Sequence, residues 1–257
     1  MITSIQNDKV KLVYGLQNRP RTRRKERKIP LEGVRLIQDA LERNYLPEFV
    51  FYQPEKADSE LITVLEGINA TLIPVNDEVM AYMTDTQNPQ GVLAVFPMPV
   101  PQMPKKPKRV LIMDNVREPG NMGTILRTAA AAGRDVILLA PGCVDPYNPK
   151  ALRSGMGAHF RVPIIEAQWF QIEEFCKSLN VYLATGKGDL QYDKVDWASP
   201  NAIIIGSEAH GAGTQSADIA THHIHIPMAA QTESLNAAVA AGVILFEAAK
   251  SLDSSAG

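Results

Sequence analysis

Polar residues and glycines gather where a hydrophobic run meets an alanine-rich run, between residues 114 and 133. Residues 109–114 predict a buried strand, and a helix is expected from about Asn121 to residue 132. Asn121 is suited to cap this helix, because its side chain can satisfy free backbone N–H groups. Arg127 would project from a helix that is otherwise small and apolar, where a guanidinium needs an anion or a polar substrate. The alternative is that Arg127 pairs with a carboxylate and Asn121 only caps the helix.

A second candidate segment is a glycine-rich turn that follows the apolar run 202–205. Gly206 and Gly211 let the backbone approach a ligand closely. Glu208, in the same turn, could accept hydrogen bonds from backbone N–H groups or from a ligand hydroxyl. The chain has neither a G-x-G-x-x-G fingerprint opening a helix nor a G-x-x-x-x-G-K-[ST] phosphate loop, so NAD and ATP chemistry are disfavoured.

A third segment runs from Ile226 through a polar loop into another alanine-rich helix, expected at 235–249. Ser234 and Asn236 lie at its entrance, where side-chain oxygens and free N–H groups face the loop. These two residues could instead merely cap a packed helix. The helix is apolar nearly all round, so it should be buried within its own domain or against a second subunit.

The net charge of −2 conceals an uneven distribution of basic residues. Nine of the 26 Lys and Arg residues lie between residues 9 and 28, where Glu26 is the only acid, which gives a local charge near +8. They are Lys9, Lys11, Arg19, Arg21, Arg23, Arg24, Lys25, Arg27 and Lys28. Such a density suits the polyphosphate backbone of a nucleic acid, with RNA favoured, and a second basic cluster at 105–109 could extend the same surface. A solvated arm is the alternative, and charge alone does not distinguish RNA from DNA.

Composition, with 45% hydrophobic residues, indicates a globular protein. Cys143 and Cys176 are far apart and neither has metal-ligand or redox spacing, so reduced thiols and a cytoplasmic location are expected. We expect neither secretion nor a membrane span, because the N-terminus lacks a signal pattern and the most apolar run, 237–246, is too short to cross a bilayer. The histidines at 222–225 have no carboxylate or cysteine beside them, so no metal site is expected.

A segment with five prolines in eleven residues, at 97–107, predicts a linker between two domains, because proline can continue neither a helix nor a central strand. Residues 1–96 predict a small α/β domain with helices at 31–43 and 60–67 and strands at 48–52, 71–75 and 91–96. Residues 108–257 contain short apolar segments at 136–140, 181–185, 201–206 and 223–226, separated by helical patterns. This alternation predicts an α/β domain with a mostly parallel sheet and helices on both faces.

The three polar segments together resemble the signature motifs of the SpoU (TrmH-like) branch of the SPOUT methyltransferases. They read N-x-x-E-P-x-N-x-G-x-x-x-R-T-A at 115–129, I-I-x-G-S-E-x-x-G at 203–211, and I-P-M-x-x-x-x-x-S-L-N-x-x-V-A-A-G at 226–242. The sequence Arg153-Ser-x-x-Gly-Ala is similar to the family's segment between the first and second motifs. Glu32-Gly-x-Arg35-Leu-Ile is similar to part of the ribosomal-protein-like, substrate-binding domain that many members carry.

The resemblance implies a deep trefoil knot in the C-terminal part and a homodimer with the active site at the subunit interface. It implies S-adenosylmethionine as the cofactor and methylation of a ribose 2′-hydroxyl in RNA, with large-subunit ribosomal RNA favoured over transfer RNA. The implied cofactor contacts are Thr185, Gly186, Gly206, Glu208, Gly211, Ile226, Met228, Leu235 and Asn236. The expected RNA contacts are Arg19, Arg21, Arg23, Arg24, Lys25, Arg27, Lys28 and Arg35. An RNA-binding homologue without catalysis is the alternative from another class.

The family's functional positions fall on Asn121, Arg127, Glu208, Ser234 and Asn236. A guanidinium rarely gives up its proton, so Arg127 is expected to stabilise the developing alkoxide rather than act as a general base. Asn121 and Ser234 would position Arg127 or the ribose, Asn236 would line the site, and Glu208 would brace the loops. The group that finally takes the proton stays open, and no metal is needed.

Overall fold

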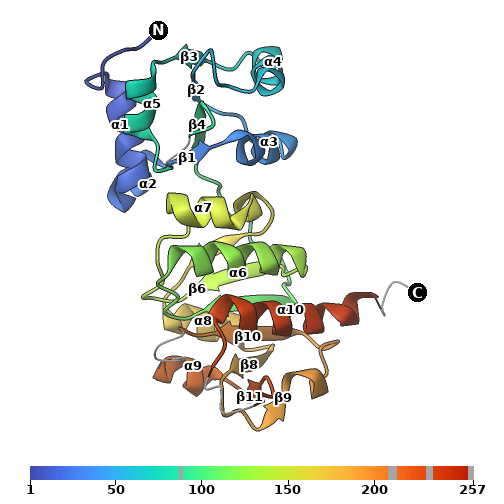
Figure 1. Ribbon diagram of the computed structural model, residues 1–257. Helices are drawn as coiled ribbons and strands as arrows, with labels where there is room; N and C mark the ends of the chain where they lie inside the picture. Colours follow the sequence, from blue (N-terminus) through green and yellow to red (C-terminus); the bar gives the residue numbers. More distant parts are fainter. Residues whose placement is uncertain (87–88, 208–212, 230–233, 254–257) are drawn as a thin grey trace. The chain divides into compact units, whose positions relative to one another are not determined.

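The computed structural model describes residues 1–86, 89–207, 213–229 and 234–253 (Figure 1). The chain divides into two compact units, and each is described by itself. The first unit contains Met1–Pro99 and Tyr147–Phe160, and the second contains Val100–Pro146 and Arg161–Gly257. The grouping of Tyr147–Phe160 with the N-terminal residues is a feature that the sequence did not predict.

The first unit is built around a four-stranded mixed sheet in the order β1-β4-β2-β3. Its elements are α1 (Asp8–Asn18), α2 (Pro20–Glu26), β1 (Lys28–Glu32), α3 (Val34–Glu42), β2 (Phe49–Tyr52), α4 (Ser59–Gly67), β3 (Leu72–Pro74), α5 (Asp77–Met83), β4 (Val92–Pro97) and α7 (Pro149–Gly155). The helix expected to begin at Leu31 begins only at Val34, because residues 28–32 pair antiparallel with β4. Gly33, with a φ of 95°, makes the turn between this strand and α3.

Alternating side chains of β4 enter two hydrophobic clusters, one on each face of this sheet. Leu93 and Val95 pack with residues of α1 and α5, whereas Ala94 and Phe96 pack with residues of α3 and α4. Successive residues of a strand point to opposite faces, so one strand serves both clusters. The second cluster also contains Leu152 of α7 and Phe160, both buried.

The second unit contains a seven-stranded sheet in the order β7-β6-β5-β10-β8-β11-β9, and every neighbouring pair is parallel. Its elements are β5 (Arg109–Met113), α6 (Pro119–Ala131), β6 (Val136–Leu139), β7 (Ile164–Glu166), α8 (Trp169–Cys176), β8 (Asn180–Ala184), β9 (Leu190–Gln191), β10 (Asn201–Ile205), α9 (Thr214–Ile219), β11 (His222–His225) and α10 (Ala237–Asp253). The predicted α/β fold with a parallel sheet is confirmed. The knot stays a prediction.

The central strands of this sheet are buried along their length, as expected for a parallel sheet covered by helices. Val110, Ile112 and Ile204 pack in one cluster with Ile172 of α8 and Ile219 of α9. The alternate residues of these strands point to the opposite face, and α6 and α10 contact each other. No helix among the described residues is long and apolar enough to cross a bilayer.

The packing of Gly157 against α3 provides a test of the grouping of Tyr147–Phe160 with the first unit. Gly157 has a φ of 75°, and a Cβ atom there would overlap the carboxylate of Asp39. We predict that Gly157→Ala lowers the free energy of unfolding by about 1–3 kcal/mol, measured by thermal or denaturant unfolding. The control is Gly67→Ala at the end of α4, where a Cβ would meet nothing within 4 Å. Equal stability of the two variants would contradict this packing.

Candidate functional site

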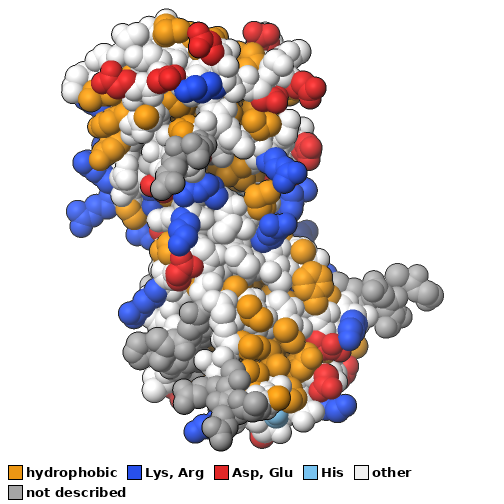
Figure 2. Space-filling view, viewed as in Figure 1, with side chains coloured by type: hydrophobic (Ala, Val, Ile, Leu, Met, Phe, Trp, Pro, Cys, Tyr) orange, Lys and Arg blue, Asp and Glu red, His pale blue; other side chains and the backbone are white. Residues whose placement is uncertain are grey.

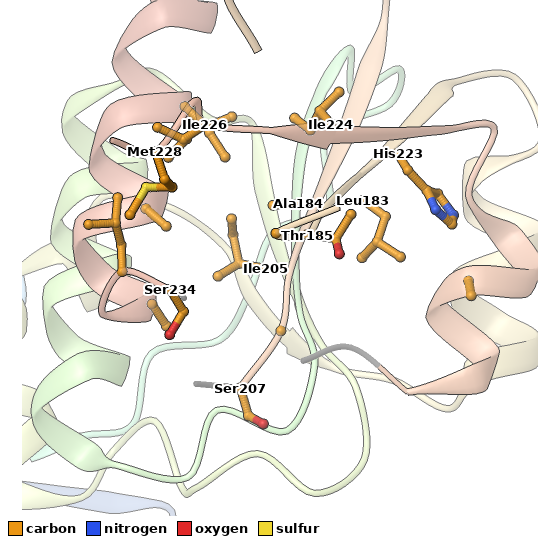
Figure 3. A pocket seen from close by; sticks show the side chains of 17 residues that line it. Leu183, Ala184, Thr185, Ile205, Ser207, His223, Ile224, Ile226, Met228 and Ser234 are labelled. Atoms are coloured by element: carbon orange, nitrogen blue, oxygen red, sulfur yellow. The ribbon is translucent and has the colours of Figure 1, made fainter. Parts of the chain in front are cut away.

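A cavity of about 490 Å³ lies at the carboxyl edge of the large sheet (Figure 3). β10, β8 and β11 are adjacent and parallel, so their carboxyl ends meet at one edge, where open α/β sheets commonly bind ligands. The walls include residues from the ends of all three strands and from the loop and first turns of α10. They are Leu183, Ala184, Thr185, Gly186, Ile205, Gly206, Ser207, Ile224, Ile226, Met228, Ser234, Leu235, Ala237, Ala240 and Ile244, together with Ala217 of α9 and His223.

The described walls carry no Lys, Arg, Asp or Glu side chain. Thr185, Ser207 and Ser234 supply hydroxyls, and Gly186 and Gly206 leave the backbone open to a ligand. His223 is the one titratable side chain among these described residues, and Figure 3 places it across the cavity from Met228 and Ser234. Such a surface suits an uncharged or cationic ligand with a large apolar part and disfavours a polyphosphate.

Six of the residues predicted to contact the cofactor line this cavity. They are Thr185, Gly186, Gly206, Ile226, Met228 and Leu235. Asn236 is not among the described lining residues, and Glu208 and Gly211 lie outside the residues that the structure describes. The sequence interpretation gave His223 no role and omitted Ala217 and Ala240. Only the three-dimensional structure shows that these three residues lie in the cavity wall.

The predicted start of α6 was wrong by two residues. The helix begins at Pro119, and its N-cap is Glu118, whose carboxylate accepts a hydrogen bond from the Asn121 N–H at 2.6 Å. Proline at the first helical position is a recognised start signal, because it has no N–H to satisfy there. The Asn121 side chain is therefore not the cap, and its Oδ1 accepts a hydrogen bond from Asn236 Nδ2 at 3.2 Å.

Asn236 joins the entrances of α6 and α10. In addition to its bond to Asn121, its Oδ1 accepts hydrogen bonds from the N–H groups of Ala238 at 2.9 Å and Val239 at 3.3 Å. The Asn236 side chain thus caps α10 and also connects the third motif to Asn121 of the first motif. Ser234, two residues earlier, lines the cavity. The structure therefore brings Asn121, Ser234 and Asn236 together.

Arg127 is not among the described residues that line the cavity of its own chain. Its side chain is exposed on α6, and it makes no hydrogen bond or ion pair with the described residues. The interpretation that Arg127 pairs with a carboxylate is therefore not supported within this part of the chain.

The outer face of α10 is apolar and exposed. Val239 and Phe246 are 52% and 54% exposed, and lie two turns apart on one side of the helix. Figure 2 shows apolar side chains gathered over the region that α10 occupies in Figure 1. The expectation that this helix is buried within its own domain therefore fails at these positions.

Comparison with known proteins identifies both parts of the chain. Residues 108–246 match the model of the SpoU rRNA Methylase family, and residues 7–94 match the MRM3-like substrate binding domain. The chain belongs to the SpoU rRNA methylase family. The mouse (Mus musculus) mitochondrial rRNA methyltransferase 3 is 34% identical to this SpoU-family chain, over 90% of this chain and 69% of the relative. The 23S rRNA (guanosine(2553)-2'-O)-methyltransferase of Bacillus subtilis is 30% identical, over 95% and 97% of the two chains.

A solved structure extends the likeness over nearly the whole chain. The AdoMet-bound rRNA methyltransferase of Sinorhizobium meliloti superposes with a TM-score of 0.85 at 30% identity, covering 98% of this chain and 97% of that chain.

The basic residues of the first unit differ in their surroundings. Arg19, Arg21, Arg24, Lys25, Arg27 and Arg35 are exposed, and Figure 2 shows Lys and Arg side chains over the region of α2. Arg23 is a correction, because it is 1% exposed and its guanidinium donates to the carbonyls of Leu16 and Gln17 at the end of α1. It closes the helix end rather than facing solvent. Lys28 forms an ion pair with Glu48 at 2.6 Å.

The two cysteines have perturbed acidities. Burial, with a smaller contribution from the charge of Asp114, raises the pKa of Cys143 to about 11. Burial raises the pKa of Cys176 to about 12. Both are therefore protonated thiols at neutral pH. Cys143 donates from Sγ to the Met113 carbonyl at the end of β5, so a thiolate nucleophile is not expected at this edge of the sheet.

The two roles of Asn236 can be separated by substitution. Asn236→Ala removes the cap, and we predict a loss of about 1 kcal/mol in the free energy of unfolding. Asn236→Asp retains an acceptor for the Ala238 and Val239 N–H groups but lacks the donor to Asn121, so its stability should stay close to that of the unmodified protein. Denaturant unfolding of both variants measures the difference. Equal losses would show that the bond to Asn121, not the cap, supports stability.

Proposed function

We propose that this chain transfers the methyl group of S-adenosylmethionine (AdoMet) to a ribose 2′-hydroxyl of ribosomal RNA, with the RNA of the large subunit as the favoured substrate. The observation that carries the proposal is the cavity at the carboxyl ends of β8, β10 and β11, whose described walls have no Lys, Arg, Asp or Glu side chain and contain residues of the second and third family motifs. The names of the relatives support this reaction class, since one acts on a 2′-oxygen of 23S rRNA and another is AdoMet-bound.

The cavity fits the cofactor in size and in chemistry. Its volume of about 490 Å³ falls within the range of small-molecule sites. AdoMet supplies a methyl group on a positively charged sulfonium, and the described walls place no Lys or Arg side chain there to repel it. Apolar side chains such as Ile205, Ile226 and Leu235 would cover the adenine, and the exposed backbone at Gly186 and Gly206 would donate and accept hydrogen bonds.

The protein's own contribution is orientation and electrostatic stabilisation. A ribose hydroxyl is barely ionised at neutral pH, so a cation close to the oxygen lowers the energy of the developing alkoxide. The Arg127 guanidinium makes no hydrogen bond or ion pair with the described residues and would supply this cation. Asn121, bonded to Asn236, and Ser234, in the cavity wall, would orient the ribose. Glu208, outside the described residues, is assigned to bracing the loop.

We propose further that two copies of the chain form the active enzyme. Arg127 does not line the cavity of its own chain, and the exposed Val239 and Phe246 give α10 an apolar face suited to a second copy. Pairing through this face would cover the apolar side chains and supply Arg127 to the cavity of the other copy. The exposed basic residues of the first unit would bind the RNA backbone.

Mixing two inactive variants tests the reaction and the shared site together. Arg127→Ala should abolish methyl transfer and keep the AdoMet Kd within severalfold, whereas Ala240→Phe should weaken AdoMet binding by about tenfold or more because the ring fills the cavity. Mixed dimers of the two should regain activity, since one cavity is intact and faces an intact Arg127. Transfer is measured with methyl-labelled AdoMet and ribosomal RNA, followed by nucleoside analysis.

The control for the cavity variant is Ala81→Phe, the same change at an exposed helical alanine of the first unit, which should bind AdoMet normally. Absence of any 2′-O-methylated nucleoside with the unmodified protein would reject the enzymatic function. Near-normal turnover of Arg127→Ala would remove Arg127 from the reaction, and failure of the mixture to regain activity would reject the shared site.

The RNA surface is tested by removing charge at Arg21, Arg24 and Lys25. The triple alanine variant should bind RNA more weakly and lower the slope of log K against log salt by about 2, because fewer counterions are released. The control is an alanine triple variant at Lys56, Lys177 and Lys194, three lysines outside the basic segment that each form an ion pair with an acid. This variant removes the same amount of positive charge. Arg23 is left intact because it supports the fold. Equal weakening by both triples would reject a local RNA surface.

A further inference from the structure

Asp114 is a buried carboxylate for which the proposed reaction supplies no role. It directly follows β5 and is 1% exposed. Its Oδ2 accepts hydrogen bonds from the Gly213 N–H and from Ser216 Oγ, both at 2.6 Å, and its Oδ1 accepts one from Asn115 Nδ2 at 3.0 Å. No Lys or Arg of the described residues pairs with it. A buried carboxylate is tolerated when its oxygens accept several hydrogen bonds, as they do here.

Two of these donors belong to the start of α9. Gly213 is the N-cap residue of this helix and has no side chain with which to cap it. The Asp114 carboxylate, which follows β5, accepts a bond from the Gly213 N–H, and the hydroxyl of the fully buried Ser216 donates a second bond to it. The backbone bond from the Asp114 N–H to the Ile205 carbonyl, at 2.9 Å, holds Asp114 beside the end of β10.

These contacts border the cavity on two sides. Gly206 and Ser207, which follow β10, line it, and so does Ala217, the residue after Ser216. Asp114 therefore contacts both the end of β10, next to Gly206 and Ser207, and the start of α9, next to Ala217. Figure 3 shows Ser207 at this wall, below Ile205.

The third donor connects the carboxylate to the loop that enters α6. Asn115 has a left-handed backbone, with a φ of 55°, and its Oδ1 accepts a hydrogen bond from Arg117 Nη2 at 3.1 Å. Gly142 packs so closely against the Asn115 side chain that a Cβ there would overlap it. The orientation of the Asn115 amide is thus held from two directions, and its N–H donor faces Asp114.

We propose that Asp114 is a positioning residue that holds the start of α9 against the end of β10, so that Ala217, Gly206 and Ser207 form the cavity walls that bind the cofactor. The inference rests on the proposed function, because it assumes that AdoMet occupies the cavity. An acid is required at this position rather than an amide, since three donors converge on two oxygens. An asparagine would turn its own N–H₂ group toward either Asn115 or the start of α9 and leave at least one donor unmatched.

The test compares Asp114→Asn with Ser216→Ala and with the double variant. Asp114→Asn should raise the AdoMet Kd, measured by calorimetry without RNA, by about tenfold, and raise the KM for AdoMet in parallel. The kcat at saturating AdoMet should fall by no more than severalfold, because Asp114 does not touch the reacting atoms. Ser216→Ala should act in the same direction, and the double variant should be close to Asp114→Asn alone, because both changes remove one network.

A matched control separates positioning from general loss of stability. Asn201→Ala removes another buried polar contact, the 2.7 Å bond from Arg134 Nη1 to Asn201 Oδ1, at the amino end of β10. It should lower the Tm and leave the AdoMet Kd unchanged. If Asp114→Asn does not fold, Ser216→Ala carries the comparison with this control.

The outcomes separate the two proposals. An AdoMet Kd within twofold of normal for Asp114→Asn, or for Ser216→Ala where the first does not fold, would overturn this inference while leaving the methyltransferase function intact. An equal rise in Kd for Asn201→Ala would also overturn it, since loss of stability alone would then explain the effect. An unmodified protein that binds no AdoMet would overturn the proposed function and this inference with it.

Discussion

The parallel register of β10, between β5 and β8, is the constraint on which the rest of the structure depends. Parallel strands all end at the same edge of a sheet, so the residues that follow β5, β8, β10 and β11 meet there although they are distant in sequence. Backbone bonds continue just past the strand ends, from Asp114 to Ile205 and from Thr185 to Ile224. β5 and β10 are buried on both faces, which leaves the carboxyl edge as the place where polar groups and a cavity can coexist.

Charge is distributed unequally between the two units. The described cavity walls carry hydroxyls and open backbone but no Lys or Arg, whereas exposed arginines are concentrated in α2 and its surroundings. A polyanion is attracted by the basic surface, and a sulfonium is accommodated where such cations are absent. A net charge near zero for the whole chain therefore says little about either ligand, because the average combines two surfaces of different character.

The sequence was informative where a local pattern determines local structure. The apolar runs at β6, β8, β10 and β11 predicted strands within about a residue at each end, within the usual uncertainty of such boundaries. β9 and β7 were missed, since two or three residues are too few to show a period. Leu31 was assigned to a helix because a short apolar run fits both the helical and the strand periodicity. Only its pairing with β4 shows that it belongs to a strand.

The errors at polar residues have a different cause. Arg23 belongs to a run of charges, and its burial follows from the packing of α2 against the end of α1, where carbonyls need donors. Asn121 was assigned the cap that Glu118 provides, although Pro119 offered a signal for the earlier start. The wall residues Ala217 and Ala240 carry no chemical signature, so the sequence could not distinguish them from ordinary helical alanines. The assignment of Arg127 to the site rests only on its residue type and on the motif around it.

The membership of Tyr147–Phe160 in the first unit has a consequence for the chain's connectivity. The backbone passes between the two units after Pro99, after Pro146 and again after Phe160, so the proline-rich segment is one of three covalent crossings. A protease that cut within that segment would break the covalent connection of residues 1–99 to the rest of the chain, and only their packing against Tyr147–Phe160 would then hold them. Removing residues 1–99 would remove most of the hydrophobic cluster that buries Leu152 and Phe160. These two side chains would then be exposed to solvent on the remaining protein. Residues 1–99 are thus not a complete unit on their own, and exchange of the first unit between related proteins would require Tyr147–Phe160 to be transferred with it.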